Sequence, residues 1–503
     1  MDSAKRVILN TSAQYIRTII SGILTLYSAR IILHSLGSDD FGIYSLVAGV
    51  VMMLSFITNA LSTTTQRYVS YYQGKGDIYQ TKIVFCNSFF LHIGIGVLVV
   101  LLLFILYPFL YDIIAIPGDR EYAASCVYFS VVAMLLISFI ASPFRAILIA
   151  HENIVFISII DVLDAIIKLL IAFSLSRISC DKLIYYGGML AAIQLINLIA
   201  FAWYCFKNYV ECVFPRFSYI DVNYLRGLSG FAGWSIYTIG CQIGRSQGIN
   251  ILLNRLLGTA VNAAYGLALQ ISSYANFLSD ALINSIRPQI IKAEGSSERN
   301  RMIYLSEVAC KYSFFLMSLV AIPCLFETPK LLSLWLGEYP EQTILLTRMY
   351  LLAMILDMLT LSFNIANQAI GKLKIYTLCV NTGKLLTVPI AYFLLKLDFP
   401  LYSMAVCYII IEFLSALIRL PIIKRQTGLT YDSYLSNVIL RLLVPTVICI
   451  ITCVFITKYL HSDYRLFLTF GVSTLFYSLS FFLIAMTKSE RCRILNMLFR
   501  RTI

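Results

Sequence analysis

The sequence alternates between long apolar stretches and short polar segments. A helix needs about 20 mostly apolar residues to cross the hydrocarbon core of a bilayer, and fourteen stretches reach that length. They cover residues 10–34, 41–65, 84–111, 122–144, 154–176, 183–206, 229–257, 262–286, 306–334, 342–370, 375–395, 401–423, 437–458 and 464–487. None of the segments between them has room for a soluble domain. The pattern predicts an all-α polytopic membrane protein with 14 transmembrane helices.

Composition narrows the function classes further. Of the 503 residues, 59% are hydrophobic and 13% are charged, against about 25% charged residues in soluble domains. An ordinary soluble enzyme, a disordered chain and a nucleic-acid-binding protein are therefore excluded. The thirteen cysteines and four histidines form no CxxC, HExxH or other paired spacing, so we expect no metal and no other cofactor.

The distribution of Lys and Arg orients the predicted helices. When the N-terminus is placed in the cytoplasm, the cytoplasmic segments carry many more Lys and Arg residues than the outer loops, as the positive-inside rule requires. An even number of spans then places both termini in the cytoplasm. The first apolar stretch follows Lys5 and Arg6 like a signal peptide. It contains Arg17 and runs past residue 30, so we interpret it as the first transmembrane helix.

An internal repeat divides the chain. A shift of 221 residues superposes Leu36-Gly37 on Leu257-Gly258 and carries the first span onto the seventh. The same shift aligns Tyr44 with Tyr265, Leu46 with Leu267, Phe56 with Phe277, Ala60-Leu61 with Ala281-Leu282, and Gly74 with Gly295. A shift by an even number of spans preserves orientation, so the repeat predicts two pseudo-symmetric six-helix lobes. We expect an N-lobe at 1–207, a cytoplasmic linker at 208–228, a C-lobe at 229–424, and two C-terminal helices with a cytoplasmic tail at 425–503.

Residues 10–51 carry a family resemblance. They read NTSAQYIRTIISGILTLYSARIILHSLGSDDFGIYSLVAGVV. The patterns N-T-x-x-x-Y-x-R, Y-x-x-R-I-I-L and L-G-x-x-D-F-G-I-Y resemble Wzx-type polysaccharide flippases of the multidrug/oligosaccharidyl-lipid/polysaccharide (MOP) exporter superfamily, whose fold is MATE-like.

The resemblance implies a function and a location. Such proteins move an undecaprenyl-diphosphate-linked oligosaccharide from the cytoplasmic to the outer leaflet of the bacterial inner membrane, by alternating access of two lobes. The implied partners are this glycan, the lipid bilayer and other polysaccharide-assembly proteins, and we expect a monomer. The resemblance specifies no glycan and no catalytic residue.

Basic residues at membrane depth are candidates for substrate binding. Charges there are costly and usually face a cavity or a partner. Arg17 and Arg30 lie on the first span and Arg245 on its repeat mate, the seventh. Arginine pairs phosphate oxygens in a bidentate way and stays charged at any pH. We expect these three, with Arg255 and Lys384, to line a cationic central cavity that receives the diphosphate.

Acidic residues at membrane depth are candidates for Na⁺ or H⁺ coupling. These are Asp161, Asp164, Asp357 and Glu412. Each has a structural alternative. Asp164 and Lys168 stand four residues apart on one helical face and are expected to form an ion pair. Asp357 is alternatively a partner of Lys384. Glu307 and Lys311, also four apart, are expected to form a local ion pair and are not counted as site residues.

Two other function classes compete with the flippase. A cation-coupled multidrug antiporter of the same superfamily should have an acidic cavity, whereas the deep arginines favour an anionic substrate. A membrane enzyme needs catalytic groups on an outer loop, and the short outer loops here hold no His/Asp/Glu constellation. A channel is disfavoured by the repeat and by the lack of a filter-like segment.

Overall fold

The computed structural model describes residues 3–109, 116–460 and 464–492. The chain forms two compact units, residues 1–236 and 237–503, and the boundary falls inside helix α8. Unit 1 is built from α1 (Ser3–Met52), α2 (Ser55–Lys75), α3 (Ile78–Leu106), α5 (Glu121–Ala150), α6 (Ile154–Ser174), α7 (Lys182–Asn208) and the first part of α8 (Val222–Leu257).

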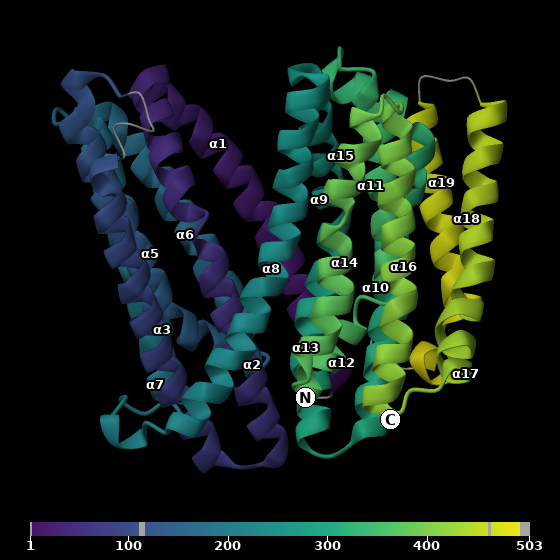
Figure 1. Ribbon diagram of the computed structural model, residues 1–503, viewed down its shortest axis with the longest axis horizontal. Coiled ribbons are helices and arrows are strands. Elements are labelled where there is room, and N and C mark those ends of the chain that lie inside the picture. The colour runs from purple at the N-terminus through teal and green to yellow at the C-terminus, as the bar shows by residue number, and fades with distance from the viewer. Residues whose placement is uncertain (1–2, 110–115, 461–463, 493–503) are drawn as a thin grey trace. The chain divides into compact units, whose positions relative to one another are not determined.

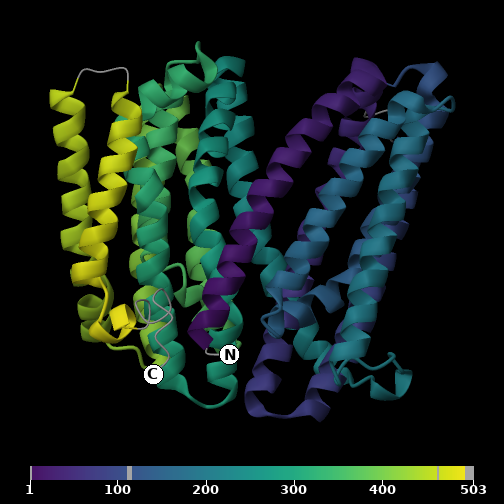
Figure 2. The ribbon, with the colours of Figure 1, turned by 180° about the vertical axis from the view of Figure 1, so that it is seen from behind.

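Unit 2 is also entirely helical in the part that the structure describes. Besides the rest of α8 it contains α9 (Thr259–Gly295), α10 (Arg299–Leu336), α11 (Gln342–Met358), α12 (Phe363–Ile370), α13 (Leu373–Tyr376), α14 (Thr382–Leu385), α15 (Thr387–Lys396), α16 (Leu401–Thr427), α17 (Tyr431–Tyr434), α18 (Leu440–Tyr459) and α19 (Arg465–Ser480). Figures 1 and 2 show α18 and α19 side by side at the edge of this unit.

Each predicted apolar stretch coincides with a helix or a run of helices, apart from residues 110 and 111, which lie outside the described part of the chain. Within the described residues, nine helices or helix runs are long and apolar enough to cross a membrane. The pair α11 and α12, bent by 49° at a short break, raises the number to ten. An all-helical polytopic membrane protein is thus confirmed, and the count of fourteen crossings stays a prediction.

The backbone supports the internal repeat at its most specific point. Gly37 has φ 83° and ψ 171°, and its repeat mate Gly258 has φ 87° and ψ 178°. This combination is accessible essentially to glycine alone. Gly37 kinks α1 between two helical segments, and Gly258 separates α8 from α9, so the aligned Leu-Gly pairs perform the same local task in the two units.

Local caps explain where several helices begin. The side chain of Asp77 accepts a hydrogen bond from the backbone N–H of Gln80 at the start of α3. Asn153 does the same for α6, and Asp181 accepts from Leu183 and Ile184 at the start of α7. Such caps satisfy backbone donors that the first turn leaves free. The helices therefore start at short polar positions between apolar stretches.

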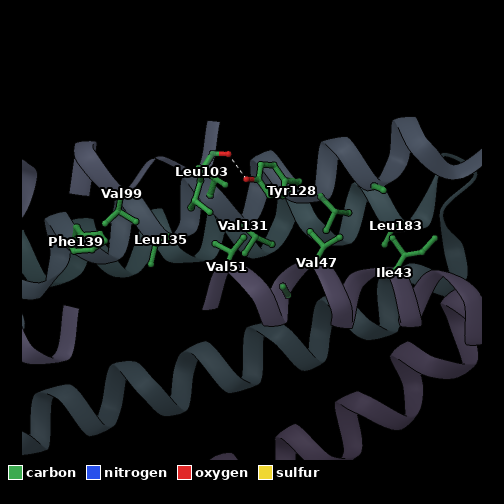
Figure 3. Close-up of a cluster of buried hydrophobic side chains, with 14 of the residues drawn as sticks. Ile43, Val47, Val51, Val99, Leu103, Tyr128, Val131, Leu135, Phe139 and Leu183 are labelled. Carbon is green, nitrogen blue, oxygen red and sulfur yellow. Dashed lines mark hydrogen bonds between the residues drawn. The ribbon is translucent and has the colours of Figure 1, made fainter. Parts of the chain in front are cut away.

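One buried hydrophobic cluster of unit 1 lies among α1, α2, α3, α5 and α7 and includes Ala232 of α8. Figure 3 shows Val47 and Val51 of α1 packing with Val131 and Leu135 of α5. The one polar group among the labelled side chains, the hydroxyl of Tyr128, donates to the carbonyl of Leu103 at 2.6 Å. Branched apolar side chains and one satisfied hydroxyl give a dry contact between helices.

In unit 2, ion pairs hold α19 and the residues that follow it against α10. Glu327 of α10 is fully buried, and Arg465 at the start of α19 binds both of its oxygens at 2.8 and 2.9 Å. The hydroxyl of Thr469 donates to the same carboxylate at 2.9 Å. At the other end of α10, Lys311 pairs with Glu490 at 2.8 Å.

The expected ion pair between Glu307 and Lys311 is therefore wrong. Lys311 binds Glu490 after α19, and Glu307 accepts hydrogen bonds from Ser433 and Asn437 at 2.7 and 3.0 Å. The two side chains have the spacing of a local pair, but tertiary packing supplies closer partners for both.

Candidate functional site

A cavity of about 320 Å³ lies wholly inside unit 2. Helices α8, α9, α11, α14 and α16 contribute its walls. Its charged lining consists of Arg245, Asp357, Lys384 and Glu412. Its neutral polar lining includes Gln242, Ser246, Ser272, Ser273, Asn276 and Asn381. The cavity therefore combines fixed charges with many hydrogen-bonding groups.

The charged residues form one connected network. The Nζ of Lys384 lies 2.8 Å from Asp357 Oδ1 and 2.7 Å from Glu412 Oε2, so it bridges the two carboxylates. Arg245 pairs with the other oxygen of Glu412. Arg419, from the same helix as Glu412, pairs with Asp357 at 2.7 Å. Each carboxylate thus binds two cations.

The network carries one uncompensated positive charge. Three cationic side chains face two carboxylates, and the side chains of Arg245, Arg419 and Glu412 are at most 8% exposed. Buried charges are costly unless they are paired, so an excess of one charge favours the binding of an anion. This balance is a property of unit 2 alone.

Three tyrosines support Arg245. Its guanidinium lies 3.7 Å from the ring centroid of Tyr408, a cation–π contact. Tyr408 packs on Tyr350, whose hydroxyl lies 2.6 Å from that of Tyr265. The Nε and Nη2 atoms of Arg245 are buried and have no hydrogen-bond partner within the described residues. The arginine is thus held in place while two donor atoms remain free.

A local irregularity places Lys384. Residues Thr377–Asn381 form a π-helical turn directly before the short helix α14. Single π-turns widen a helix and are frequent at functional sites. The amide of Asn381 donates to Thr238 Oγ1 of α8 at 3.1 Å. The turn therefore ties this broken helix to α8 next to the cavity.

Unit 1 contains a second group of charges. Asp161 of α6 pairs with Arg17 of α1 at 2.6 Å and with Arg145 of α5 at 2.9 Å. Asp164 pairs with Lys168 at 2.7 Å, which confirms the expected local ion pair. The amide of Asn197 in α7 also donates to Asp164. The side chains of Arg17, Arg145, Asp161 and Lys168 are 25–40% exposed, whereas no side chain of the unit 2 network exceeds 18%.

The predicted site residues fall into three groups. Lys384, Arg245, Asp357 and Glu412 come together in unit 2, and the alternative pairing of Asp357 with Lys384 is confirmed. Arg17, Asp161 and Asp164 lie in unit 1 and are paired. Arg30 and Arg255 are exposed and take part in no ion pair between residues that the structure describes. That all of these residues line one central cavity remains a prediction.

Two arginines in these networks are absent from the candidates chosen on sequence. Arg419 follows Glu412 by seven residues, which places both on one helical face. That spacing was a usable signal. Arg145 stands one residue beyond the predicted end of its span, yet α5 continues to Ala150. Hydropathy marks only the apolar part of a helix, so it misses a charge in the last turns.

The described residues contain no group of three or more His, Cys, Asp or Glu side chains arranged to hold a metal ion. The carboxylates of the unit 2 network bind the protein's own cations instead.

Comparison with known proteins gives a family match over part of the chain. Residues 3–236 match the profile of a family described as polysaccharide biosynthesis protein. The match covers 234 of the 503 residues. The matched segment ends at the boundary of unit 1. No curated protein matches the sequence.

Solved structures give the fold. An outward-facing multidrug resistance MATE family transporter of the MOP superfamily is 13% identical with a TM-score of 0.71, over 85% of this chain and 96% of that chain. A MOP superfamily transporter from Pyrococcus furiosus is 14% identical with a TM-score of 0.72, over 85% and 96%. The MATE transporter ClbM in complex with Rb⁺ is 16% identical with a TM-score of 0.70, over 86% and 96%. The chain therefore has the same fold as these transporters.

Proposed function

We propose that this protein is a flippase that moves undecaprenyl-diphosphate-linked oligosaccharide repeat units from the cytoplasmic to the outer leaflet of the bacterial cytoplasmic membrane. Fourteen spans, two six-helix lobes and cytoplasmic termini belong to this proposal, with alternating access of the lobes through a cationic central cavity. The family match over residues 3–236 and the MOP transporter fold support it.

The observation that carries the proposal is the charge balance of the unit 2 network. Three cations against two carboxylates leave one positive charge for a ligand to neutralise. A phosphate group of the lipid diphosphate supplies negative charge, and arginine binds phosphate oxygens well. The unpartnered Nε and Nη2 atoms of Arg245 are the donors we assign to this contact.

The cavity volume limits what binds inside unit 2. At about 320 Å³ it lies at the lower end of the range for small-molecule sites, roughly 300–1,000 Å³. It suits one phosphate or one sugar rather than a whole repeat unit. Neutral groups such as those of Gln242, Asn276 and Asn381 are suited to sugar hydroxyls. We propose that the lipid tail stays in the bilayer.

Lys384 is the residue that we expect to respond to the ligand. An anion in the cavity competes with Asp357 and Glu412 for this ammonium group, because the positive charge of Lys384 attracts the ligand and the two carboxylates alike. The network therefore has two arrangements, one with Lys384 on the carboxylates and one with Lys384 on the ligand. A coupling ion, Na⁺ or H⁺, would act in the same way by neutralising a carboxylate and releasing Lys384.

The alternative is a cation-coupled multidrug antiporter, as the MATE description of the structural neighbours suggests. Two carboxylates already neutralised by three cations are a poor site for a cationic drug. The polarity of the pocket also varies within this fold, since the P. furiosus neighbour is described by a reverse polarity of its binding pocket. We therefore favour an anionic ligand.

Gene deletion with complementation tests the proposal. The deletion strain should lose surface polysaccharide and accumulate lipid-linked repeat units. The wild-type gene should restore the polysaccharide and remove the accumulated repeat units. Lys384→Ala and Arg245→Ala, if present in the membrane at normal levels, should leave the polysaccharide absent and the repeat units accumulated. Arg301→Ala is the matched control, because this exposed arginine lies outside the cavity and pairs with the exposed Glu298. Normal polysaccharide with new drug sensitivity in the deletion strain would favour the antiporter.

A further inference from the structure

The segment between α7 and α8, Tyr209–Asp221, exposes large apolar side chains on the surface of unit 1. Phe214 and Phe217 are each 78% exposed, and Val210 is 69% exposed. Large apolar side chains clustered on one exposed loop mark an interaction surface. Figure 1 shows this segment as the teal loop at the lower left, following the lower end of α7.

The loop is held firmly against unit 1. The side chain of Asn87 in α3 donates to the carbonyl of Tyr219 at 2.8 Å and accepts from the N–H of Asp221 at 3.0 Å. Glu211 is buried and lies 2.5 Å from His151 at the end of α5. The exposure of the phenylalanines is therefore a fixed feature of the surface and does not come from a loosely attached loop.

Contacts with α3 show where the loop lies along a candidate membrane span. The ring of Phe217 stacks on that of Phe90 with 4.9 Å between centroids. Phe90 follows Lys82, the last Lys, Arg, Asp or Glu in α3, by eight residues, or about 12 Å along the helix. This helix is one of the strongest candidate membrane spans. Phe217 therefore lies beside the apolar part of a span and not beyond its polar end.

The exposed charges around the phenylalanines are basic. Arg216 stands between them, and Lys207 and Arg226 flank the loop; all three are exposed. Of the acidic residues, Glu211 is buried against His151, and Asp221 accepts a hydrogen bond from the N–H of Asn223 at the start of α8. An apolar surface edged by basic residues fits the boundary between acyl chains and anionic headgroups.

We propose that the loop Tyr209–Asp221 is an interfacial membrane anchor, with Phe214 and Phe217 inserted at the acyl–headgroup boundary and Arg216 bound to the headgroup of an anionic phospholipid. The anchor fixes the end of α7 at one depth in the bilayer. It also holds, at the membrane surface, the chain that enters α8 and leads into unit 2. The proposal is independent of the transported substrate.

Depth-dependent fluorescence quenching tests the position of the loop. The full-length protein carries Phe214→Trp or Phe217→Trp after its natural Trp203, Trp234 and Trp335 are changed to Phe. It is placed in nanodiscs of phosphatidylcholine and phosphatidylglycerol. Lipids brominated on the upper acyl chain should quench each new tryptophan at least about twofold more strongly than aqueous acrylamide does. Monodisperse elution shows that each variant is folded.

A control and two outcomes make the test decisive. Asn300→Trp in the same background lies in the exposed first turn of α10, and acrylamide should quench it more strongly than the lipids. The same pattern at positions 214 and 217 would overturn the proposal and point to a soluble partner for this surface.

The lipid charge is tested separately. Raising the phosphatidylglycerol fraction should shift the emission of the position 214 tryptophan to the blue, and Arg216→Gln should abolish that dependence. If the emission wavelength of this tryptophan does not change with the phosphatidylglycerol fraction while Arg216 is intact, the assignment of Arg216 to an anionic headgroup is contradicted.

Discussion

At the scale of single residues, Glu412 pairs with two cations, Arg245 and Lys384, whereas Arg245 pairs with one carboxylate. When Arg245 is removed, Glu412 keeps Lys384 as a partner. When Glu412 is removed, Arg245 keeps its contact with Tyr408 but has no carboxylate partner among the described residues. The two partners of one ion pair are therefore unequal.

This inequality predicts an order of stabilities. Glu412→Ala should lower the free energy of unfolding by about 3–5 kcal/mol, the cost of a buried charge without a partner, and Arg245→Ala should cost clearly less. The double variant Arg245→Met/Glu412→Met should recover part of the loss. Thermal unfolding of the purified variants in detergent measures the order, and a greater loss in Arg245→Ala than in Glu412→Ala would contradict it.

Glu211 predicts a pH dependence outside the membrane spans. Burial alone would raise its pKa, but hydrogen bonds from His151 and Gln73 and the charge of His151 favour the carboxylate, so the pKa lies below the ordinary value of 4.5. A depressed folded-state pKa contributes stability above the unfolded pKa, and this stability is lost as pH falls through the folded pKa. Stability should therefore fall as the pH drops below about 4.5.

The comparison is between wild type and Glu211→Gln. The variant cannot titrate at this position, so its melting temperature should vary less over the same acidic range. Parallel curves for the two proteins would show that another group dominates acid unfolding.

At the scale of elements, two glycines perform one task. Gly37 and Gly258 adopt a backbone conformation that other residues reach only under strain. Gly258→Ala should destabilise the protein by about 1–3 kcal/mol. Gly266→Ala in the following helix is the matched control. A Cβ there meets nothing within 4 Å, and alanine favours helix. Equal effects of the two substitutions on thermal unfolding would contradict the requirement for glycine at position 258.

The attachment of α19 to α10 gives a second prediction at this scale. Arg465→Ala leaves the buried carboxylate of Glu327 without its bidentate partner. Amide hydrogen exchange in α19 should therefore become faster, while exchange in the unit 1 helices stays unchanged. Arg465→Lys keeps the charge but loses the fork geometry, and should give an intermediate rate. Unchanged exchange in α19 of Arg465→Ala would show that apolar contacts alone hold this helix.

Hydropathy and helix spacing predicted much of the fold, because apolar stretches and local pairs depend on neighbours along the chain. The helix positions and the pair Asp164–Lys168 follow from that information. The partners of Glu307 and Lys311 do not, because packing brings residues 120 or more positions away against them. Lys384 was predicted as a site residue, but its bridging position depends on a π-turn that no spacing rule reveals.

At the scale of the whole molecule, two observations concern different units. The family profile covers unit 1, and the network with an excess positive charge lies in unit 2. If both units serve one transport cycle, variants in either should block the same step. Arg17→Ala in unit 1 and Lys384→Ala in unit 2 should therefore accumulate the same lipid-linked intermediate in cells. Different accumulated species would show that the two charge clusters act in different steps.

The most direct test of the central claim is transport by the purified protein. Proteoliposomes containing it are loaded with a fluorescent undecaprenyl-diphosphate-linked oligosaccharide in both leaflets, and an impermeant quencher reports the exposed fraction over time. The account predicts that the protected half becomes accessible with the wild-type protein and remains protected with Lys384→Ala or in empty vesicles. A protected half that stays protected with the wild-type protein, under Na⁺ and pH gradients of either sign, would contradict the flippase.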